Sequence, residues 1–303
     1  MLNGPSQLAG AVVRPNGTIE LPSRHIQQSQ QQQSSQQQQA EKKEQRIGDF
    51  VIKHTLGKGT FSKVCLAEHR LTKQKVALKF IKPKTASKAD KHNTRVEREI
   101  KLLSLLYHPH IVRLYDMVQH HKYTMIVMEY TPGGELLQFI RKRGRLSERE
   151  ARIYFRQIVS ALDYCHRNCI IHRDLKLENV MLDGDGRIRL IDFGFSTTFR
   201  GDGLLDTFCG SPFYAAPEMV NGIRYIGPEV DIWSLGVILF FMVCGRTPFE
   251  GENLKEIYEK ISRGHFTLPQ YVTSDCTDLL KKMLTVAPKL RIKMQDIRSH
   301  RWI

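Results

Sequence analysis

The residues of this chain best equipped for chemistry stand at positions 172–179, which read His-Arg-Asp-Leu-Lys-Leu-Glu-Asn, and at positions 192–194, which read Asp-Phe-Gly. The carboxylate of Asp174 can orient a hydroxyl group and accept its proton. Asn179 and, thirteen residues later, Asp192 offer the oxygen ligands that Mg²⁺ prefers. This spacing predicts a site that holds a metal-bound nucleotide and aligns a hydroxyl against its γ-phosphate.

A glycine-containing segment precedes this site and would hold the phosphates of the nucleotide. Residues 50–56 predict a strand, residues 57–64 (Gly-Lys-Gly-Thr-Phe-Ser-Lys-Val) a tight turn, and residues 76–80 a further strand. Glycine lets a backbone turn sharply and approach phosphates without a Cβ in the way. Ser62 stands where such a loop usually has a third glycine, and because serine is small we expect the loop to tolerate it.

Lys79, on the last of these strands, is the candidate for a phosphate-binding lysine. The alternative is an exposed lysine on an edge strand, and an acidic partner on the next helix would distinguish the two. Apolar residues recur at a helical period over positions 90–107, and Glu99 lies on this predicted helix, twenty residues after Lys79. We therefore expect a Lys79–Glu99 ion pair. Glu97 is the competitor, but two positions along a helix it would face elsewhere.

The segments that follow predict a buried strand, a turn and a mainly helical half. The apolar run at 123–129 is typical of a buried strand, and the Pro and Gly residues within 130–134 predict a turn. Ser147 with Glu150 is a capping-box pattern that opens a helix over 148–167. Its apolar side should carry Ile153, Ile158, Val159, Leu162 and Cys165.

A second helix is expected from Asp231 through Val243. Its apolar run is too short to cross a bilayer, which needs about 20 residues. We expect it to be the buried central helix of the second half.

In this order, the motifs resemble those of eukaryotic Ser/Thr protein kinases, from about residue 50 to residue 303. The segment Thr-Phe-Cys-Gly-Ser-Pro at 207–212, followed by Ala-Pro-Glu at 216–218, is most similar to the AMP-activated and microtubule-affinity-regulating kinases. Both belong to the calmodulin/AMP-activated group.

The resemblance implies an α+β, bilobal protein kinase fold with an ATP cleft between the lobes. The small β-rich N-lobe would be residues 47–131 and the large helical C-lobe residues 132–303. Residues 1–46 differ in composition, because positions 27–39 are almost all glutamine. Such a tract has little apolar surface to bury, so we expect a disordered Gln-rich tail.

The resemblance also assigns roles to single residues. The catalytic group would be Asp174, Lys176, Lys79 and Glu99. Asn179 and Asp192 would bind Mg²⁺, with Mn²⁺ as an alternative metal. The cofactor ATP would be held by the glycine loop, by apolar residues around the adenine and by the backbone of the hinge, which the resemblance places at the turn of residues 130–134. These residues are Leu56, Gly57, Gly59, Val64, Ala77, Lys79, Glu129, Thr131, Glu135, Glu178 and Met181.

Three supporting contacts follow from the same resemblance. Asp231 would anchor the backbone of the catalytic loop. Ser211 would hydrogen-bond beside Lys176 and shape the pocket for the acceptor hydroxyl. Glu218 and Arg291 would form a structural salt bridge.

Thr207 would be an activating phosphosite, modified by an upstream kinase. A phosphate adds about −1.5 to −2 charge, and Arg173, next to Asp174, would receive it, with Arg95 as a second partner. The alternative is an ordinary loop threonine. The acids Glu135 and Glu178 imply protein substrates with a Ser or Thr preceded by basic residues.

The charge of the chain raises two rival hypotheses. A formal net charge of +15 and a pI near 9.6 are compatible with a protein that binds nucleic acid or a membrane surface. The basic residues do not alternate with aromatic ones as a stacking platform would require, so we expect no nucleic-acid partner. A pseudokinase scaffold is the second rival. It predicts that Lys79, Asp174, Asn179 or Asp192 is replaced, and none is.

The N-terminus and the cysteines bear on location. No basic segment followed by an apolar core opens the chain, so we expect a cytoplasmic or nuclear protein with no transmembrane segment. The six cysteines should then be free thiols. Cys165 and Cys169 flank His166, but the spacing fits no common zinc site, and a core cysteine is the simpler interpretation.

Overall fold

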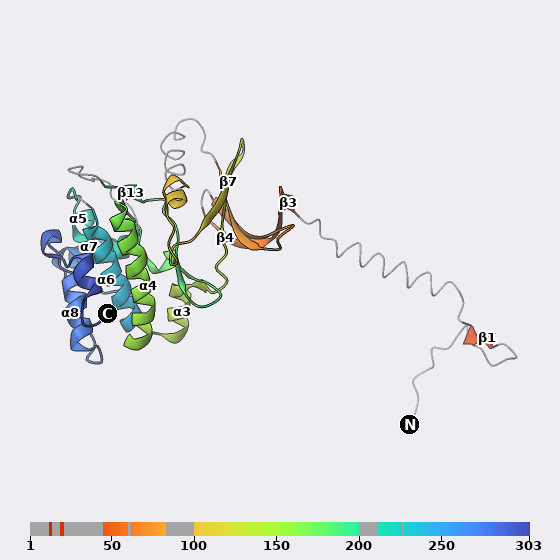
Figure 1. Ribbon diagram of the computed structural model, residues 1–303. Helices are drawn as coiled ribbons and strands as arrows, with labels where there is room; N and C mark the ends of the chain where they lie inside the picture. The colour runs from red at the N-terminus through yellow and green to blue at the C-terminus, as the bar shows by residue number, and fades with distance from the viewer. Residues whose placement is uncertain are drawn as a thin grey trace, which may run out of the picture.

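The structure, a computed structural model, describes residues 12–13, 19–20, 45–59, 62–82, 100–199, 211–225 and 227–303. Figure 1 shows a β-sheet and a group of helices that occupy separate parts of the molecule. The predicted α+β arrangement is confirmed, with the sheet formed by the N-terminal part and the helices by the C-terminal part.

The N-terminal part is built on an antiparallel sheet of six strands in the order β3-β4-β5-β6-β8-β7. The strands are β3 (Arg46–Ile47), β4 (Phe50–Lys58), β5 (Ser62–His69), β6 (Lys75–Ile81), β7 (Leu114–His120) and β8 (Tyr123–Glu129). The bounds of β8 are those predicted from its apolar run.

The two faces of this sheet bury different residues, because side chains alternate along a strand. One face carries a cluster that includes Leu78 and Val127, with Phe80 and Tyr123 packed against it. The other face carries Ile81 and Ile126, against which Ile100 packs. Alternation also places Lys79 on this second face, opposite Ile126 in the register of β6 and β8.

The helix predicted for 90–107 is described only from residue 100 onward. Residues 100–105 are helical, and Ile100 and Leu103 are buried. The predicted end was wrong: Tyr107 lies beyond the helix and is 75% exposed. Pro109 follows closely, and the residue before a proline avoids helical backbone angles, which favours this earlier end.

The C-terminal part is mainly helical. Its helices are α3 (Leu136–Arg143), α4 (Glu148–Arg167), α5 (Pro217–Val220), α6 (Glu229–Cys244), α7 (Leu254–Arg263), α8 (Ser274–Met283) and α9 (Met294–Arg298). Short helical turns stand at η1 (Leu177–Asn179), η2 (Pro212–Tyr214) and η3 (Pro288–Leu290). Their apolar residues form one continuous buried cluster.

Two small sheets accompany the helices of the C-terminal part. One has the order β12-β11-β9 and consists of β9 (Gly134–Glu135), β11 (Val180–Leu182) and β12 (Ile188–Leu190). The other pairs β10 (Ile170–Ile171) with β13 (Thr197–Thr198). The segments that join these strands carry the residues 172–179 and 192–194.

Helix α4 begins as predicted. The Ser147 hydroxyl accepts the Glu150 N–H at 3.3 Å, and the Glu150 carboxylate accepts the Ser147 N–H at 3.1 Å, which completes a capping box. Four of the five residues expected on its apolar side are buried, but Ile153 is 56% exposed, so that prediction was wrong. Ile153 lies two positions, or about 200° of helix rotation, from the buried Ala151.

Helix α6 is the predicted buried helix. Every residue from Val230 to Val243 is buried, Asp231 among them. Gly236 allows a close approach to α8, since a Cβ at this position would lie 3.0 Å from the Met283 Cβ. Within the described residues, no helix is both long and apolar enough to cross a membrane.

Most of the predicted tail lies outside the described residues. Within it, β1 (Val12–Val13) pairs with β2 (Ile19–Glu20), and the disorder expected for the rest stays a prediction, as does the boundary between lobes at residue 131. The described cysteines are free thiols, as expected: Cys65, Cys165, Cys169, Cys244 and Cys276. Cys165 is buried, but Cys169 is exposed, so the interpretation as a core cysteine is confirmed for Cys165 alone.

Candidate active site

The predicted catalytic residues 174–179 form a connected polar cluster. The Lys176 ammonium lies 2.8 Å from the Asp174 Oδ2 and donates to the Ser211 hydroxyl at 3.0 Å. The Asn179 amide nitrogen donates to the Asp174 carbonyl at 2.8 Å and to its Oδ2 at 3.2 Å. Asp174 and Asn179 are each only 5% exposed. These contacts fix the Asp174 carboxylate, and the predicted bond from Lys176 to Ser211 is present.

Asp231, on α6, holds the backbone at the start of the loop 172–179. Its two carboxylate oxygens accept the N–H groups of His172 and Arg173, each at 2.9 Å. His166 contributes its Nε2 at 2.9 Å. Burial would raise the pKa of Asp231, but the hydrogen bond and charge of His166 and the bonds from the loop hold it below its ordinary value. The anchor is therefore a carboxylate, as the resemblance implied.

Arg173 adopts a backbone angle that the anchor stabilises. Its φ is +63°, a region that costs non-glycine residues energy. Its side chain donates from Nε to the Phe195 carbonyl at 2.7 Å. The residue thus connects the catalytic loop with the segment after Gly194. Thr207 and Arg95, its predicted partners, lie outside the described residues, and the proposed phosphate contact stays a prediction.

Asp192 meets Lys79 across the cleft. The Lys79 Nζ lies 3.9 Å from the Asp192 Oδ1, which also accepts the Gly194 N–H at 3.3 Å. Burial would raise the pKa of Asp192, but the positive charge of Lys79, the Gly194 N–H and more distant cations together lower it. Asp192 is therefore ionised near neutral pH. Glu99 lies outside the described residues, so the Lys79–Glu99 pair stays a prediction.

A cavity of about 720 Å³ opens beside these groups. Its walls come from β4, β5 and β6 above, from the segment after β8 at one edge, and from η1, β11 and Asp192 below. The predicted nucleotide-binding residues that line it are Leu56, Gly57, Val64, Ala77, Lys79, Glu129, Thr131, Glu135, Glu178 and Met181.

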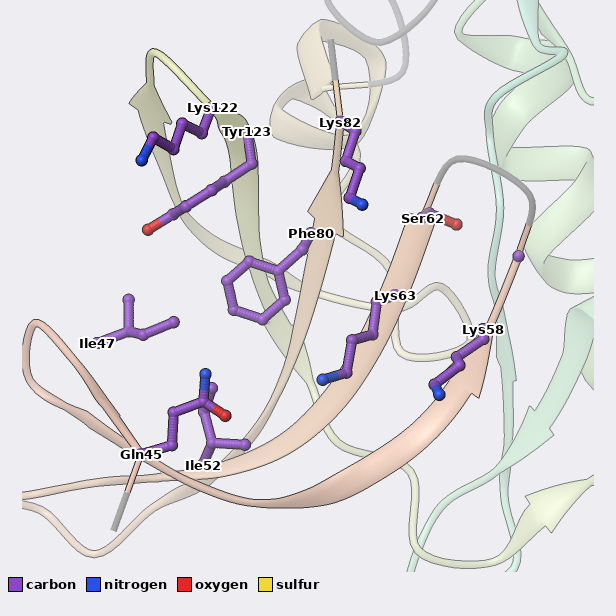
Figure 2. A pocket seen from close by; sticks show the side chains of 11 residues that line it. Gln45, Ile47, Ile52, Lys58, Ser62, Lys63, Phe80, Lys82, Lys122 and Tyr123 are labelled. Carbon is purple, nitrogen blue, oxygen red and sulfur yellow. The ribbon is translucent and has the colours of Figure 1, made fainter. Parts of the chain in front are cut away.

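Gly59 is the exception among the predicted nucleotide-binding residues. It lines a hollow on the opposite, outer face of the sheet, into which Lys58, Lys63 and Phe80 point (Figure 2). Its N–H donates to the Ser62 carbonyl at 2.8 Å, so this group is engaged within the loop. Ser62 lines both spaces.

The cavity also has walls that sequence reasoning missed. Val112 and Ile191 are apolar, and Ile191 directly precedes Asp192, so its position next to the Asp-Phe-Gly motif was a usable signal. Phe139 and Lys142, on α3, also line the cavity, and neither residue type nor spacing points to them.

The donor set of the cleft suits a nucleotide with a divalent metal. Because the Asn179 nitrogen is used by Asp174, the amide oxygen is the atom of this side chain that can serve as a ligand. Asp192 adds a carboxylate. Among the described residues, the Asp174 Oδ1 and the Glu178 Oε2 are buried without a hydrogen-bond partner. An unpaired buried acceptor is costly, so both atoms are suited to donors that a ligand brings.

A buried ion pair stabilises the region below the site. Arg291 donates to the two oxygens of Glu218 at 2.7 and 3.0 Å, and both side chains are at most 3% exposed. Arg291 also bonds the carbonyls of Thr285, Val286 and Glu229. The predicted Glu218–Arg291 bridge is thus present, with its remaining donors satisfied.

The comparisons with known proteins agree with this geometry. The model of the protein kinase domain matches residues 50–303. A carbon catabolite-derepressing protein kinase from Candida glabrata is 48% identical over 257 residues, which is 85% of this chain and 42% of that protein. A protein of the same name from Candida tropicalis is 49% identical over 257 residues, 85% of this chain and 41% of its own length.

The chain spans less than half of the length of these relatives. They are kinases of the AMP-activated family, so the resemblance stated from the motifs is confirmed. Kinases of this type use ATP and a divalent metal ion. With motif order, cleft and family model in agreement, the chain belongs to the protein kinase family.

Proposed function

We propose that this chain is a Ser/Thr protein kinase that transfers the γ-phosphate of Mg–ATP to hydroxyl groups of protein substrates. The observation that carries the proposal is the hydrogen-bonded cluster of Asp174, Lys176 and Ser211. Glu178, two residues after Lys176 in the same loop, lines the cavity. The cluster brings an acceptor for the hydroxyl proton and a cation within hydrogen-bonding distance of each other. A pseudokinase scaffold would not require a proton acceptor and a cation held together at this position.

Each residue of the site has a defined task in this reaction. Asp174 orients the substrate hydroxyl and takes its proton through Oδ1, the oxygen that has no partner. Lys176 stabilises the charge of the transferred phosphoryl group, and Lys79 binds the α- and β-phosphates. Glu99 would hold Lys79 in that position.

Asn179 and Asp192 would hold the metal ion, Mg²⁺ or Mn²⁺. A bound metal supplies positive charge that neutralises the phosphate oxygens. The low pKa of Asp192 keeps its carboxylate ready for this role without a proton to remove. The adenine would lie between Val64 and Ala77 above and Met181 below, with its edge toward the backbone of Glu129 and Thr131, since all five line the cavity. Leu56 and Gly57 would cover the nucleotide from β4.

Carboxylates near the cleft favour basic peptides. Glu135 lies at the cavity mouth, and Glu178 has a buried oxygen without a partner. An arginine side chain presents donors that suit both. We expect substrates with basic residues N-terminal to the phosphorylated Ser or Thr, despite the positive net charge of the chain.

Phosphorylation of Thr207 by an upstream kinase would activate the enzyme. Each charge-assisted hydrogen bond from Arg173 to the phosphate is worth ~1.5–3 kcal/mol. One such bond shifts a two-state equilibrium at least about ten-fold. The cytoplasmic or nuclear location stays a prediction, as do the protein substrates and the upstream kinase.

The test is phosphorylation of a degenerate Ser/Thr peptide library with γ-labelled ATP. Protein stoichiometrically phosphorylated on Thr207 is compared with the same protein after phosphatase treatment, and with a Thr207→Ala variant. We expect label in peptides with basic residues before the acceptor, and a large fall in rate without the phosphate. No transfer by the phosphorylated protein, together with Mg–ATP binding, would instead support a scaffold. Equal rates before and after phosphatase would remove the Thr207 switch.

A further inference from the structure

A network of side chains connects β8, whose last residue lines the cavity, with the three-stranded sheet β12-β11-β9. Glu129, the last residue of β8, accepts the Arg189 Nε on its Oε1 at 2.8 Å. Its Oε2 accepts the Arg113 N–H at 3.2 Å, and its own N–H donates to the Arg113 carbonyl at 2.9 Å. Glu129 is thus fixed by backbone and side chain to Arg113, the residue before β7, and to β12 by an ion pair.

The same arginine holds a second carboxylate. The Arg189 Nη1 lies 3.0 Å from the Asp183 Oδ2. The Asp183 Oδ1 accepts the N–H groups of Asp185 and Arg187 at 2.9 and 2.8 Å, so this residue shapes the turn between β11 and β12. We call Glu129, Arg189 and Asp183 the hinge network.

The hinge network is shielded from solvent. The side chains of Arg189, Glu129 and Asp183 are 16%, 20% and 11% exposed. Ion pairs on an open surface contribute little, because water and salt screen them. At this burial, and with a guanidinium donating to two carboxylates, the interaction holds a defined geometry.

The main chain between β8 and β9 follows the same turn closely. The Gly133 N–H donates to the Leu182 carbonyl at 2.9 Å. A Cβ at position 133 would come within 2.7 Å of the Leu182 Cβ, so only glycine permits this approach. The segment that carries Thr131 is therefore pressed against the β11–β12 turn that Asp183 organises.

The hinge network reaches the nucleotide cavity at Glu129, and at Arg189 it is paired with a strand that lines the cavity. Glu129 lines its edge, and Met181, which lines its floor, is the register partner of Arg189 in the β11–β12 pair. The distance between edge and floor determines how well a flat base fits between them. A side-chain brace across these two elements fixes that distance before the ligand arrives, which lowers the ordering cost of binding.

We propose that Arg189 is a positioning residue for nucleotide binding, acting through Glu129 and Asp183 to set the angle between the hinge and the cavity floor. The proposal rests on the nucleotide site proposed above. It assigns no contact between Arg189 and the nucleotide. Arg189 acts on the ligand through the geometry of its two partners.

The test compares Arg189→Gln with Arg187→Gln. Arg187 is a matched control, because it lies two residues before Arg189, at the end of the turn that precedes β12, and its side chain pairs with Asp185 at 3.7 Å, with both side chains more than 60% exposed. Dissociation constants for Mg–ADP and Mg–ATP are measured by calorimetric titration, and KM and kcat with a fixed peptide substrate. Thermal midpoints are recorded for every variant.

We expect Arg189→Gln to raise the dissociation constant for Mg–ADP about five-fold, equivalent to ~1 kcal/mol, and KM for ATP with it. The value of kcat should change less than about two-fold, since the catalytic loop is anchored by Asp231 instead. Arg187→Gln should bind like the unchanged protein. Arg189→Lys should fall in between, because an ammonium retains the charge but lacks the planar pair of donors.

A double-mutant cycle with Glu129→Gln completes the experiment. If Arg189 acts through Glu129, the double variant should bind hardly worse than either single one. Independent, additive losses would overturn the proposal. So would an Arg189→Gln protein with a lowered thermal midpoint but the nucleotide affinity of Arg187→Gln, which would make the network purely structural. Failure of the unchanged protein to bind Mg–ADP would overturn the nucleotide site itself, and this proposal with it.

Discussion

The two walls of the cleft are built on different principles. The lower wall includes the end of the loop 172–179, and side chains hold this loop: Asp231 fixes its backbone, and Asp174 is 5% exposed within a set of hydrogen bonds. The upper wall, the end of β4, is held by its backbone ladder with β5. Residues 53–58 are exposed, and the register shifts twice along this pair.

This difference follows from what each wall has to do. Groups that stabilise a transition state act best when they are fixed before the reaction, since reorganisation would cost energy at that moment. A wall that covers a nucleotide has to let the ligand enter and leave. Its few buried contacts place it among the less stable parts of a fold. We expect substitutions in the lower wall to affect catalysis and stability, and those in the upper wall to affect mainly nucleotide binding.

The largest effect is expected for Asp174→Asn in the lower wall. The amide cannot accept the hydroxyl proton as a carboxylate does, so kcat should fall by about 10²–10⁴-fold. Circular dichroism and the affinity for Mg–ADP should stay near those of the unchanged protein, because asparagine retains the size of the side chain. Phosphate transfer to a peptide is the measurement. A loss of less than ten-fold would mean that another group receives the proton.

The second prediction tests the buried ion pair between Glu218 and Arg291. Glu218→Gln leaves the Arg291 guanidinium buried and without its counter-charge, which typically costs about 3–5 kcal/mol. The thermal midpoint should fall by roughly 6–20 °C. Glu250→Gln is the control, because its pair with Arg246 lies on the surface at 3.8 Å. Similar midpoints for the two variants would show that the buried pair contributes no more than an exposed one.

Much of the lower wall could be predicted from the sequence, because its residues lie close together along the chain. The chemistry of 172–179 and 192–194 depends on local spacing, and the structure brings Asp174, Lys176 and Asn179 into contact. The capping box at Ser147 was equally local. Residue types and short intervals were sufficient for these features.

Features that depend on distant pairs could not be predicted in the same way. Glu129 and Arg189 are sixty residues apart, and neither interrupts a pattern that would mark it. Strands of two or three residues, such as β9 and β11, are too short to show a period. Ile153 was misplaced because its apolar type was considered without its angle around the helix.

The third prediction concerns the interaction between Lys79 and Asp192, which face each other across the cleft. Removing Lys79 takes away the strongest influence that lowers the pKa of Asp192, while burial continues to raise it. In the unchanged protein the pKa of Asp192 lies below its ordinary value of 3.8, so the carboxylate stays charged until the pH falls below that value. In Lys79→Met it should take up a proton at higher pH, so metal binding should be lost earlier as the pH falls.

The measurement is the affinity for Mn²⁺–ADP as a function of pH, between about 5 and 7.5, which brackets the range where a raised carboxyl pKa would show. Lys63→Met is the control, because Lys63 points into the outer hollow on the other face of the sheet (Figure 2). The Lys79→Met affinity should fall more steeply on the acid side than that of the control. Parallel curves would mean that Lys79 does not control the ionisation of Asp192.

The smallest effect is expected for Leu56→Ala in the upper wall. Leu56 lines the cavity but is 43% exposed, so it contributes only part of the burial that a core leucine would. At ~0.8 kcal/mol per buried methylene, loss of part of this side chain should raise KM for ATP about three- to five-fold. The value of kcat should not change, because no atom of the lower wall moves. Leu71→Ala is the control, since Leu71 is 83% exposed in the turn between β5 and β6. A fall in kcat for Leu56→Ala would show that the two walls are coupled, and that the division between positioning below and binding above does not hold.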